Sequence, residues 1–265
     1  MIDQVSAAFA LKLAAGALVL AFLAAERLRP AGPWQGGAPR IGRNLALWLG
    51  NSALALAVVV PLTAWAAGHG LGWRPTWWAG VPGFALDLLL LDLWLYAWHR
   101  ANHRLPLLWR FHEIHHRDAM LDVTTAVRFH PGEILLSALV RAPLMILLAM
   151  PLASIVAFEA LVLAATAFHH SNLALPPRLE RALSRLVVTP SIHWVHHHAR
   201  RRDTDSNYAT VLSLWDRLFA SRSPTARSPA MALGDEGEAA LGLGRLVMLP
   251  FRRPGAAGRA SAGGA

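Results

Sequence analysis

Long apolar runs constrain the fold of this chain more than any other feature of its sequence. Residues 6–25, 45–67 and 80–98 each have the length of about 20 residues that a helix needs to cross a bilayer. Only 15% of the residues are charged and 55% are hydrophobic, whereas a soluble domain carries about 25% charged residues. The sequence therefore predicts an all-α, multi-span membrane protein, because helices satisfy their own backbone hydrogen bonds within lipid.

Two further apolar runs, residues 133–150 and 152–168, are harder to interpret. They are short for membrane spans, are separated by Pro151 alone, and contain Arg141 and Glu159. Two tilted spans fit this pattern, and so does a re-entrant hairpin, because non-helical backbone is tolerated at membrane depth where protein buries it. The sequence leaves both arrangements open.

Arginine placement predicts the orientation of these helices. The arginines gather in residues 26–44, 99–132 and 171–222, which lie on one side of the membrane if every run crosses it. The 68–79 loop on the other side carries Arg74 and three tryptophans, which are typical of a membrane interface. Because cytoplasmic loops carry the excess of basic residues, we expect the polar segments to face the cytoplasm. The same topology accounts for the formal charge of +9, so no nucleic-acid partner is expected.

Histidines cluster in these polar segments. His99 and His103 directly follow the third apolar run at a spacing of i, i+4, and residues 112–116 and 193–197 each place three histidines at i, i+3 and i+4. Each set therefore shares one helix face. Neutral imidazoles that point inwards from several helices suit iron, zinc, copper or nickel. So many unpaired imidazoles beside a membrane are costly without a shared ligand, so the pattern favours a metal site over packed core histidines.

The number of histidines predicts two metal ions, because one ion takes four to six ligands. AFHHSN adds His169 and His170 to the sets above. The chain has no cysteine, which excludes disulfides, thiolate zinc sites and Cys-ligated iron–sulfur clusters. Carboxylates are scarce near the motifs, and Glu113 in HEIHH points away from the histidine face.

Asp92 is the carboxylate that aligns with the histidines. Residues 92, 96, 99 and 103 follow one another at i, i+4, i+7 and i+11 along one helix face. A charged group in a membrane helix is costly and marks a functional candidate. We expect Asp92 to accept a proton from a ligand imidazole and so to fix its tautomer. An ion pair with an arginine is the alternative.

These segments together resemble the integral-membrane fatty acid hydroxylase and sterol desaturase superfamily. The matching segments cover about half of the chain and follow in order: DLWLYAWHRANH (92–103), FHEIHH (111–116), RFHP (128–131), FHHSN (168–172), TPSIHWVHHH (189–198), DSNYA (205–209) and LWDRLFAS (214–221). Ala209 departs from the family pattern, which usually has glycine there. His198 is an additional histidine and is expected to be a bystander.

The resemblance implies a helical membrane scaffold with a cytosolic, histidine-lined catalytic cap that holds two metal ions, usually taken to be iron. The metal ligands that it implies are His99, His103, His112, His115, His116, His170, His193, His196 and His197. His130 would be a further ligand or a hydrogen-bond partner. Asn172 and Asn207 would lie beside the ligands and support them.

The resemblance also implies an activity, since family members insert oxygen into, or remove hydrogen from, unactivated C–H bonds of lipids. We therefore expect an O2-dependent lipid hydroxylase, desaturase or monooxygenase that uses two Fe2+ ions, which zinc can replace on purification. The sequence has no GxGxxG and no haem-attachment motif, so a separate reductase, ferredoxin or cytochrome-type donor is expected to supply electrons. The Arg-rich face, including residues 200–202, is a candidate docking site for an acidic donor.

Two other classes of protein would use similar residues. A membrane di-zinc hydrolase would generate hydroxide at the same ligands and would not need O2. A metal transporter would place its histidines within the spans, along a pathway. The short chain resembles bacterial members of the superfamily, so we expect the bacterial inner membrane as its location. The sequence predicts neither the oligomeric state nor the particular lipid.

The expected organisation has five parts. Residues 1–98 hold three membrane helices, 99–132 the first histidine motifs, 133–170 the fourth and fifth membrane segments, 171–222 the second HxxHH, and 223–265 a partly disordered tail. In that tail, LGLGRLVMLPFRR is expected to form a short amphipathic segment that lies on the bilayer.

Overall fold

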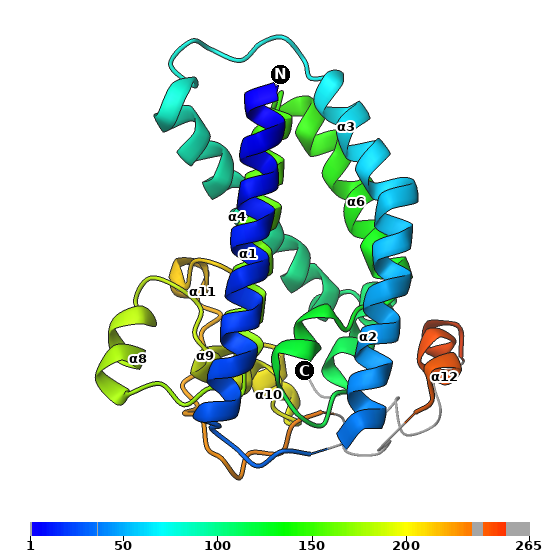
Figure 1. Cartoon of the computed structure of the whole chain (residues 1–265), viewed down its shortest axis with the longest axis vertical. Helices are drawn as coiled ribbons and strands as arrows, with labels where there is room; N and C mark the ends of the chain where they lie inside the picture. The colour runs from blue at the N-terminus through cyan, green and yellow to red at the C-terminus, as the bar shows by residue number, and fades with distance from the viewer. Residues whose placement is uncertain (1, 36, 235–240, 253–265) are drawn as a thin grey trace.

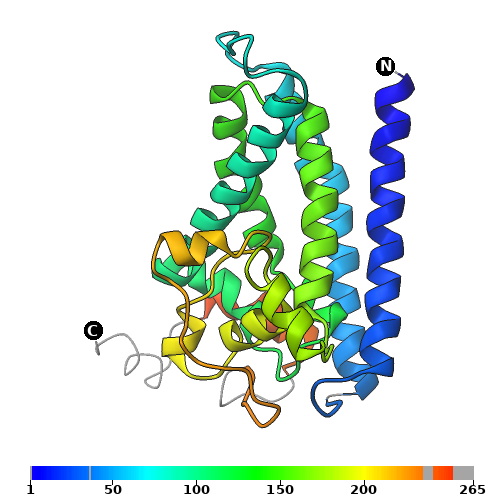
Figure 2. The ribbon, with the colours of Figure 1, turned by 90° about the vertical axis from the view of Figure 1, so that its left-hand side faces the viewer.

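Long helices form a bundle, and shorter ones gather at one of its ends (Figures 1 and 2). The computed structural model describes residues 2–35, 37–234 and 241–252, without the side chains of residues 2–9. The bundle contains α1 (Ile2–Leu28), α2 (Gly37–Leu54), η1 (Ala55–Val59), α3 (Val60–Gly68), α4 (Gly80–Arg104), α6 (Pro131–Leu147) and α7 (Leu152–His170). The shorter elements are α5 (Pro106–His116), η2 (Val123–Val127), α8 (Pro177–Leu183), α9 (Pro190–His196), α10 (Arg201–Thr204), α11 (Leu214–Leu218), α12 (Leu243–Val247) and η3 (Leu249–Phe251).

The bundle confirms the predicted fold class. Three helices are long and apolar enough to cross a membrane: the continuous helix Gly37–Gly68, α4 and α7. Within the described residues the structure contains isolated β-bridges but no strand. The chain is therefore a helical membrane protein, and its polar segments form a cap at one end of the bundle.

The fourth and fifth apolar runs form two separate helices, α6 and α7. The end of α6 and the turn that follows it lie against the 69–79 loop: Ile146 O of α6 accepts a hydrogen bond from Leu71 N at 2.9 Å, and Ala149 O of the turn accepts one from Arg74 at 3.0 Å. That loop joins α3 to α4 at the end of the bundle opposite the cap (Figure 1). Both helices therefore extend from the cap to the far end of the bundle.

The two charged residues in these helices bind each other. Arg141 of α6 donates to Glu159 of α7 at 3.1 Å, and the same nitrogen donates to Thr63 of α3 at 3.3 Å. A charge within lipid is stabilised when it is paired in this way. The ion pair thus joins three helices of the bundle, next to an apolar core that includes Leu91, Met145, Ile155 and Phe158.

A buried arginine fixes the segment between α5 and α6. Arg40 of α2 donates to Asp118 at 2.5 Å and 2.8 Å, and to Asp122 at 2.6 Å. Its side chain is almost fully buried, so these bidentate and charge-assisted bonds replace its hydration. This arginine therefore has a structural role in addition to its contribution to the positive charge of the cap.

The expected amphipathic segment of the tail contains α12, which docks on the protein. Leu246 is buried against Leu47 of α2 and Ile114 of α5, whereas Leu243 and Met248 are exposed. Whether this segment lies on a bilayer stays a prediction. Residues 235–240 and 253–265 of the expected disordered tail lie outside the described residues.

Candidate metal centre

Four helices bring the histidines together at the cap. α4 carries His99 and His103 in its last turns, and α7 ends at His170. The short helix α5 carries the first HxxHH triplet, and α9 carries His193 and His196 of the second, with His197 directly after its last residue. Each of these short helices begins at a proline, whose fixed φ and missing N–H suit the first helical turn.

The nine expected ligands fall into two compact groups. Within each group, one ring nitrogen of every histidine lies within 4.8 Å of the others. The first group is His99, His103, His112, His116 and His196, and the second is His115, His170, His193 and His197. The groups adjoin, because the ring centroids of His116 and His197 are 4.3 Å apart. Each triplet contributes to both groups, so the two triplets face each other and all nine rings are buried.

Backbone carbonyls fix the tautomers in the first group. His99 Nδ1 lies 2.7 Å from Tyr208 O, and His196 Nδ1 lies 2.6 Å from Ser206 O. A carbonyl oxygen only accepts, so both Nδ1 atoms carry the proton and both Nε2 atoms present a lone pair. These two Nε2 atoms are 3.1 Å apart. Two lone pairs at that distance repel each other unless a cation lies between them.

The second group repeats this arrangement. His170 Nδ1 lies 2.8 Å from Thr166 O and His115 Nδ1 lies 3.3 Å from Arg128 O, while their Nε2 atoms are 3.1 Å apart. His193 Nε2 is 2.9 Å from His170 Nε2 and 3.1 Å from His197 Nε2. Four Nε2 atoms from three segments of the chain therefore converge on one point.

Several buried ring nitrogens in the groups have no hydrogen-bond partner within the described part of the chain. They are both nitrogens of His103 and His116, Nε2 of His112, and Nδ1 of His193 and His197. An unsatisfied buried nitrogen of this kind costs about 1–3 kcal/mol. Metal coordination would satisfy the nitrogens that face the group centres, so the residues fit two metal ions, and the purely neutral donor set suits a transition metal.

Burial keeps five histidines of the two triplets neutral. It is the largest cause that lowers the pKa well below 6.5, and neighbouring imidazoles lower the pKa further, for His115, His116, His193, His196 and His197. Neutral imidazole is the form that binds a metal. These rings are therefore ready to act as ligands at neutral pH.

Glu133 is a site residue that the sequence analysis missed. His112 Nδ1 lies 2.8 Å from Glu133 Oε1, and Asn102 Nδ2 donates to the same oxygen at 3.0 Å. A carboxylate that accepts from a ligand histidine orients its ring and raises its basicity. The available signal was a glutamate at the cap end of a membrane helix, directly after RFHPG. Asp205 Oδ1 also lies near a ring of the first group, 3.4 Å from His103 Nδ1, but no hydrogen bond joins the two atoms.

The expected contact between Asp92 and a ligand imidazole is wrong. Asp92 accepts hydrogen bonds from Val211 N at 3.3 Å, Leu212 N at 3.1 Å and Trp215 Nε1 at 2.7 Å. Asp92 precedes His99 by seven residues of helix, a rise of about 10 Å. All three of these donors belong to the segment that follows Tyr208 in the chain. Asp92 instead holds the segment that presents Tyr208 O to His99.

Asn172 and Asn207 connect chain segments, and neither side chain forms a hydrogen bond with a ring nitrogen of the nine histidines in the described part of the chain. Asn172 Oδ1 accepts from Ala31 N at 3.2 Å and Gly32 N at 2.9 Å. Asn207 has a φ of 52°, which asparagine tolerates, and its side chain bonds to Ile192 O and Ser223 N. Any support that these residues give to the ligands is therefore indirect.

His130 lies outside both histidine groups. Its Nδ1 accepts from Gly132 N at 2.8 Å and so caps α6, while Nε2 lies 2.9 Å from Val247 O. His130 is therefore a hydrogen-bond partner of α6 and of α12, and not a tenth ligand.

The remaining histidines also lie outside the groups. His169 packs against His193 with ring centroids 4.0 Å apart, and its neighbour His170 is the grouped residue. His198 pairs with Asp203 at 2.7 Å, and His69 binds Trp65 O near the opposite end of the bundle. Ala209 has no positive φ, so the alanine at this family glycine position brings no backbone strain.

Known protein families and relatives match the part of the chain that contains this site. A family model described as "Fatty acid hydroxylase" matches residues 84–221, which is 138 of the 265 residues and includes all nine grouped histidines. Alkylglycerol monooxygenase from Danio rerio is 32% identical over 152 residues, which cover 56% of this chain and 31% of the relative.

Two other relatives carry different names. Ornithine lipid hydroxylase OlsE from Rhizobium tropici is 30% identical over 217 residues, covering 81% of this chain and 63% of the relative. A cholesterol 25-hydroxylase-like protein from Danio rerio is 27% identical over 158 residues, covering 56% of this chain and 62% of the relative. The chain thus spans less than two thirds of the length of each of these relatives. No solved structure matches it significantly.

The family model extends over more than half of the chain and over the whole histidine cluster. The protein therefore belongs to the fatty acid hydroxylase family.

Proposed function

We propose that this protein is an integral-membrane, O2-dependent lipid hydroxylase whose histidine groups hold two iron ions. The observation that carries the proposal is the pair of adjacent groups of buried imidazoles, in which Nε2 atoms face one another at 2.9–3.1 Å. The first group would provide up to five ligands to one ion and the second four to the other.

Iron supports the proposed reaction better than zinc. Bound iron would supply the redox chemistry that activates O2 and breaks an unactivated C–H bond, whereas zinc has no redox chemistry. Neither group contains a carboxylate. The ligand set is thus unlike the carboxylate-rich sites of soluble di-iron bundles.

The names of the relatives support oxygen insertion into a lipid. Monooxygenase and hydroxylase both describe that reaction, and the three names refer to an alkylglycerol, an ornithine lipid and cholesterol. We infer hydroxylation of a membrane lipid for this chain, ahead of desaturation. The lipid itself differs between relatives, so residues outside the shared histidines are expected to select it.

The residues of this chain orient the ligands and exclude water. Backbone carbonyls of Tyr208, Ser206 and Thr166 each receive an Nδ1–H, which turns the Nε2 atoms towards the group centres. The Tyr208 side chain is fully buried, and its ring centroid lies 5.2 Å from that of His103. Rings held in this way need little reorganisation when the metal changes its charge.

We further propose that the cap faces the cytoplasm of a bacterial inner membrane and receives electrons from a separate protein. The positive-inside rule supports this orientation, since the cap holds most arginines of the chain. Arg201 is less available to a donor than expected, because it binds Asp205 at 2.8 Å and stacks over Trp109 at 4.1 Å. Arg200 and Arg202 remain candidates.

The proposal is tested by His196→Ala, with His69→Ala as the matched control. His196 belongs to the first group, whereas His69 lies outside both groups. We expect two metal ions per chain, identified as iron by elemental analysis of protein purified without oxygen. Membranes with the wild-type chain, a reductant and O2 should yield a lipid that has gained one oxygen atom. His196→Ala should abolish this product, and His69→Ala should retain it.

Two results would contradict the proposal. One is a wild-type product that forms equally well without O2, which would indicate a hydrolase. The other is a His196→Ala protein that inserts into the membrane and stays fully active. A product that has lost two hydrogen atoms would instead assign the chain to desaturation.

A further inference from the structure

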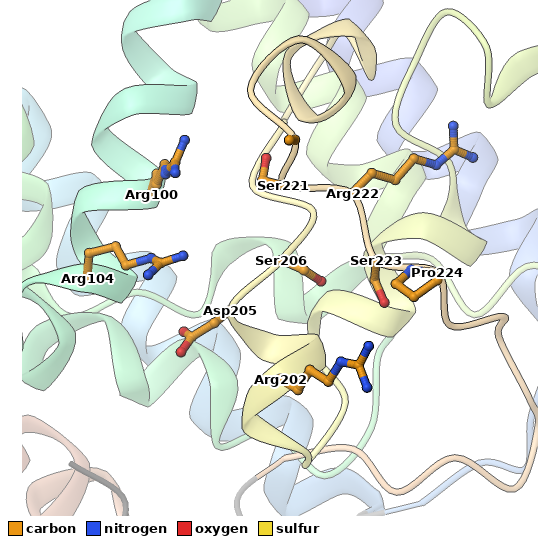
Figure 3. A pocket seen from close by; sticks show the side chains of 10 residues that line it. Arg100, Arg104, Arg202, Asp205, Ser206, Ser221, Arg222, Ser223 and Pro224 are labelled. Atoms are coloured by element: carbon orange, nitrogen blue, oxygen red, sulfur yellow. The ribbon is translucent and has the colours of Figure 1, made fainter. Parts of the chain in front are cut away.

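A basic hollow of about 190 Å³ lies beside the histidine centre. Figure 3 shows that its lining comes from three parts of the chain: the end of α4, the residues from α10 to Ser206, and the segment that follows α11. Four arginines surround the hollow, namely Arg100, Arg104, Arg202 and Arg222, and Asp205 is the only carboxylate among its lining residues.

The positive charge of the hollow is not neutralised from within. Asp205 is already bound by Arg201, which is not a lining residue, at 2.8 Å. Arg202 and Arg222 are exposed. Arg222 N donates to Asp216 O at 3.2 Å, but no hydrogen bond or ion pair of either guanidinium group is found among the residues that the structure describes. A concave site lined by several arginines with few internal partners attracts an anion with oxygen acceptors.

The wall of the hollow contacts the first histidine group. Asp205 Oδ1 lies 3.4 Å from His103 Nδ1, and Ser206 O receives the Nδ1–H of His196 at 2.6 Å. Both residues also line the hollow. An anion bound there is therefore separated from the histidine centre by one layer of residues.

Exposed apolar side chains lie next to the hollow. Leu214, Leu218 and Phe219 are 43%, 63% and 41% exposed, and Phe219 directly precedes the lining residues Ala220–Pro224. The Phe219 ring stacks on Tyr96 of α4, with centroids 5.1 Å apart. The exposed ring of Phe219, which directly follows α11, therefore packs on the last third of α4, a helix that is long enough to cross the membrane.

We propose that this hollow binds the anionic headgroup of the lipid substrate, a phosphate or a carboxylate, while the apolar part of the lipid lies along Phe219 and α4. The identification of this lipid as the substrate rests on the function proposed above; the binding of the headgroup does not. The concave shape and small volume suit one headgroup, whereas even a weakly bound electron-donor protein would cover an area of up to about 600 Å² on each partner.

The test compares ligand binding by the purified full chain in neutral detergent. The probes are dihexanoyl phosphatidic acid, an N-acylglycine of similar chain length, neutral dihexanoylglycerol and inorganic phosphate. We expect at least one anionic lipid to bind more tightly than dihexanoylglycerol and than inorganic phosphate. Arg202→Ala/Arg222→Ala should weaken that binding about 10- to 100-fold, the range expected for lost charge-assisted hydrogen bonds. Arg178→Ala, which removes an exposed arginine of α8 outside the hollow, should leave it unchanged.

Several results would overturn the proposal. Equal affinity for charged and neutral lipids would do so, as would an unchanged affinity of the double variant. Equally tight binding of inorganic phosphate would indicate a free-anion site. If the double variant bound lipid normally but accepted electrons more slowly from a protein donor, the hollow would be a donor site. The assay measures binding without turnover. Headgroup binding can therefore be confirmed even if the chain proves not to be an oxygenase.

Discussion

At the scale of single residues, the ligand histidines differ in the group that accepts the hydrogen bond from Nδ1, the ring nitrogen that points away from the group centre. His99, His170 and His196 donate from Nδ1 to backbone carbonyls, whereas His112 donates to the carboxylate of Glu133. A charged acceptor forms a stronger hydrogen bond than a neutral one and raises the basicity of the ring. Glu133 is therefore the side chain from which we expect the largest indirect effect on the metal.

Glu133→Gln should weaken metal retention about 10- to 100-fold, because a neutral amide replaces the carboxylate that accepts from His112. The measurement is the loss of metal to a chelator at fixed pH. Glu113→Gln is the matched control, since Glu113 is on the same helix as His112 but pairs with Arg117 at 3.1 Å. Equal metal retention in both variants would mean that Glu133 only fills space.

At the scale of elements, the site depends on the 205–216 segment as much as on the helices. Asp92 of α4 binds Val211 N, Leu212 N and Trp215 Nε1, and Asp216 accepts from Tyr208 N at 2.8 Å. Two buried carboxylates thus fix the backbone that supplies the Tyr208 and Ser206 carbonyls. Burial is the largest cause that raises the pKa of Asp216, and its hydrogen bonds oppose this shift.

Asp92→Asn should destabilise this segment, because its amide nitrogen cannot accept from the N–H groups that the carboxylate binds. We expect a loss of about 2 kcal/mol in the free energy of unfolding and faster proteolysis between α10 and α11. Metal retention should fall less than in Glu133→Gln, because Asp92 does not contact an imidazole. If Asp92→Asn loses metal as readily as Glu133→Gln without any loss of stability, the indirect role is wrong.

At the scale of the whole molecule, the bundle buries a set of imidazoles that would otherwise titrate near neutral pH. Burial lowers the pKa of His115, His116, His193, His196 and His197 below their usual 6.5. The unfolded chain therefore binds protons below pH 6.5 that the metal-free folded chain does not. The stability that these groups contribute is fully present above pH 6.5 and is lost as the pH falls towards their lowered pKa values.

The metal-free protein should consequently become less stable between pH 7 and pH 5. Each titrating histidine lowers the free energy of unfolding by about 1.4 kcal/mol per pH unit once the pH is well below 6.5, so the Tm in detergent should fall steeply. The metal-loaded protein should hold its Tm to lower pH, because protons must displace the metal before they reach the ligand nitrogens. A metal-free Tm that is the same at pH 7 and pH 5 would contradict this account.

Much of the architecture was predictable from periodicity and composition. The apolar runs form helices that include the three candidate spans. The i, i+3, i+4 spacing places the first HxxHH triplet on α5, whereas the second has two histidines on α9 and His197 at its C-terminal cap. The structure places His170 in the second group and His169 in neither, and the choice of His170 as the ligand stays a prediction. That choice came from the family resemblance, since spacing alone treats the two neighbours alike.

The sequence by itself determined the membrane helices, the histidine-rich cap and the family, because these depend on length, hydrophobicity and local spacing. Only the tertiary structure decided how the nine histidines divide between two groups, that Glu133 receives the proton of His112, and that Asp92 binds a distant segment. The arginines of the basic hollow also come from separate segments. Helix periodicity shows which side chains share a face, but the partner that meets that face depends on how residues far apart in the chain pack together.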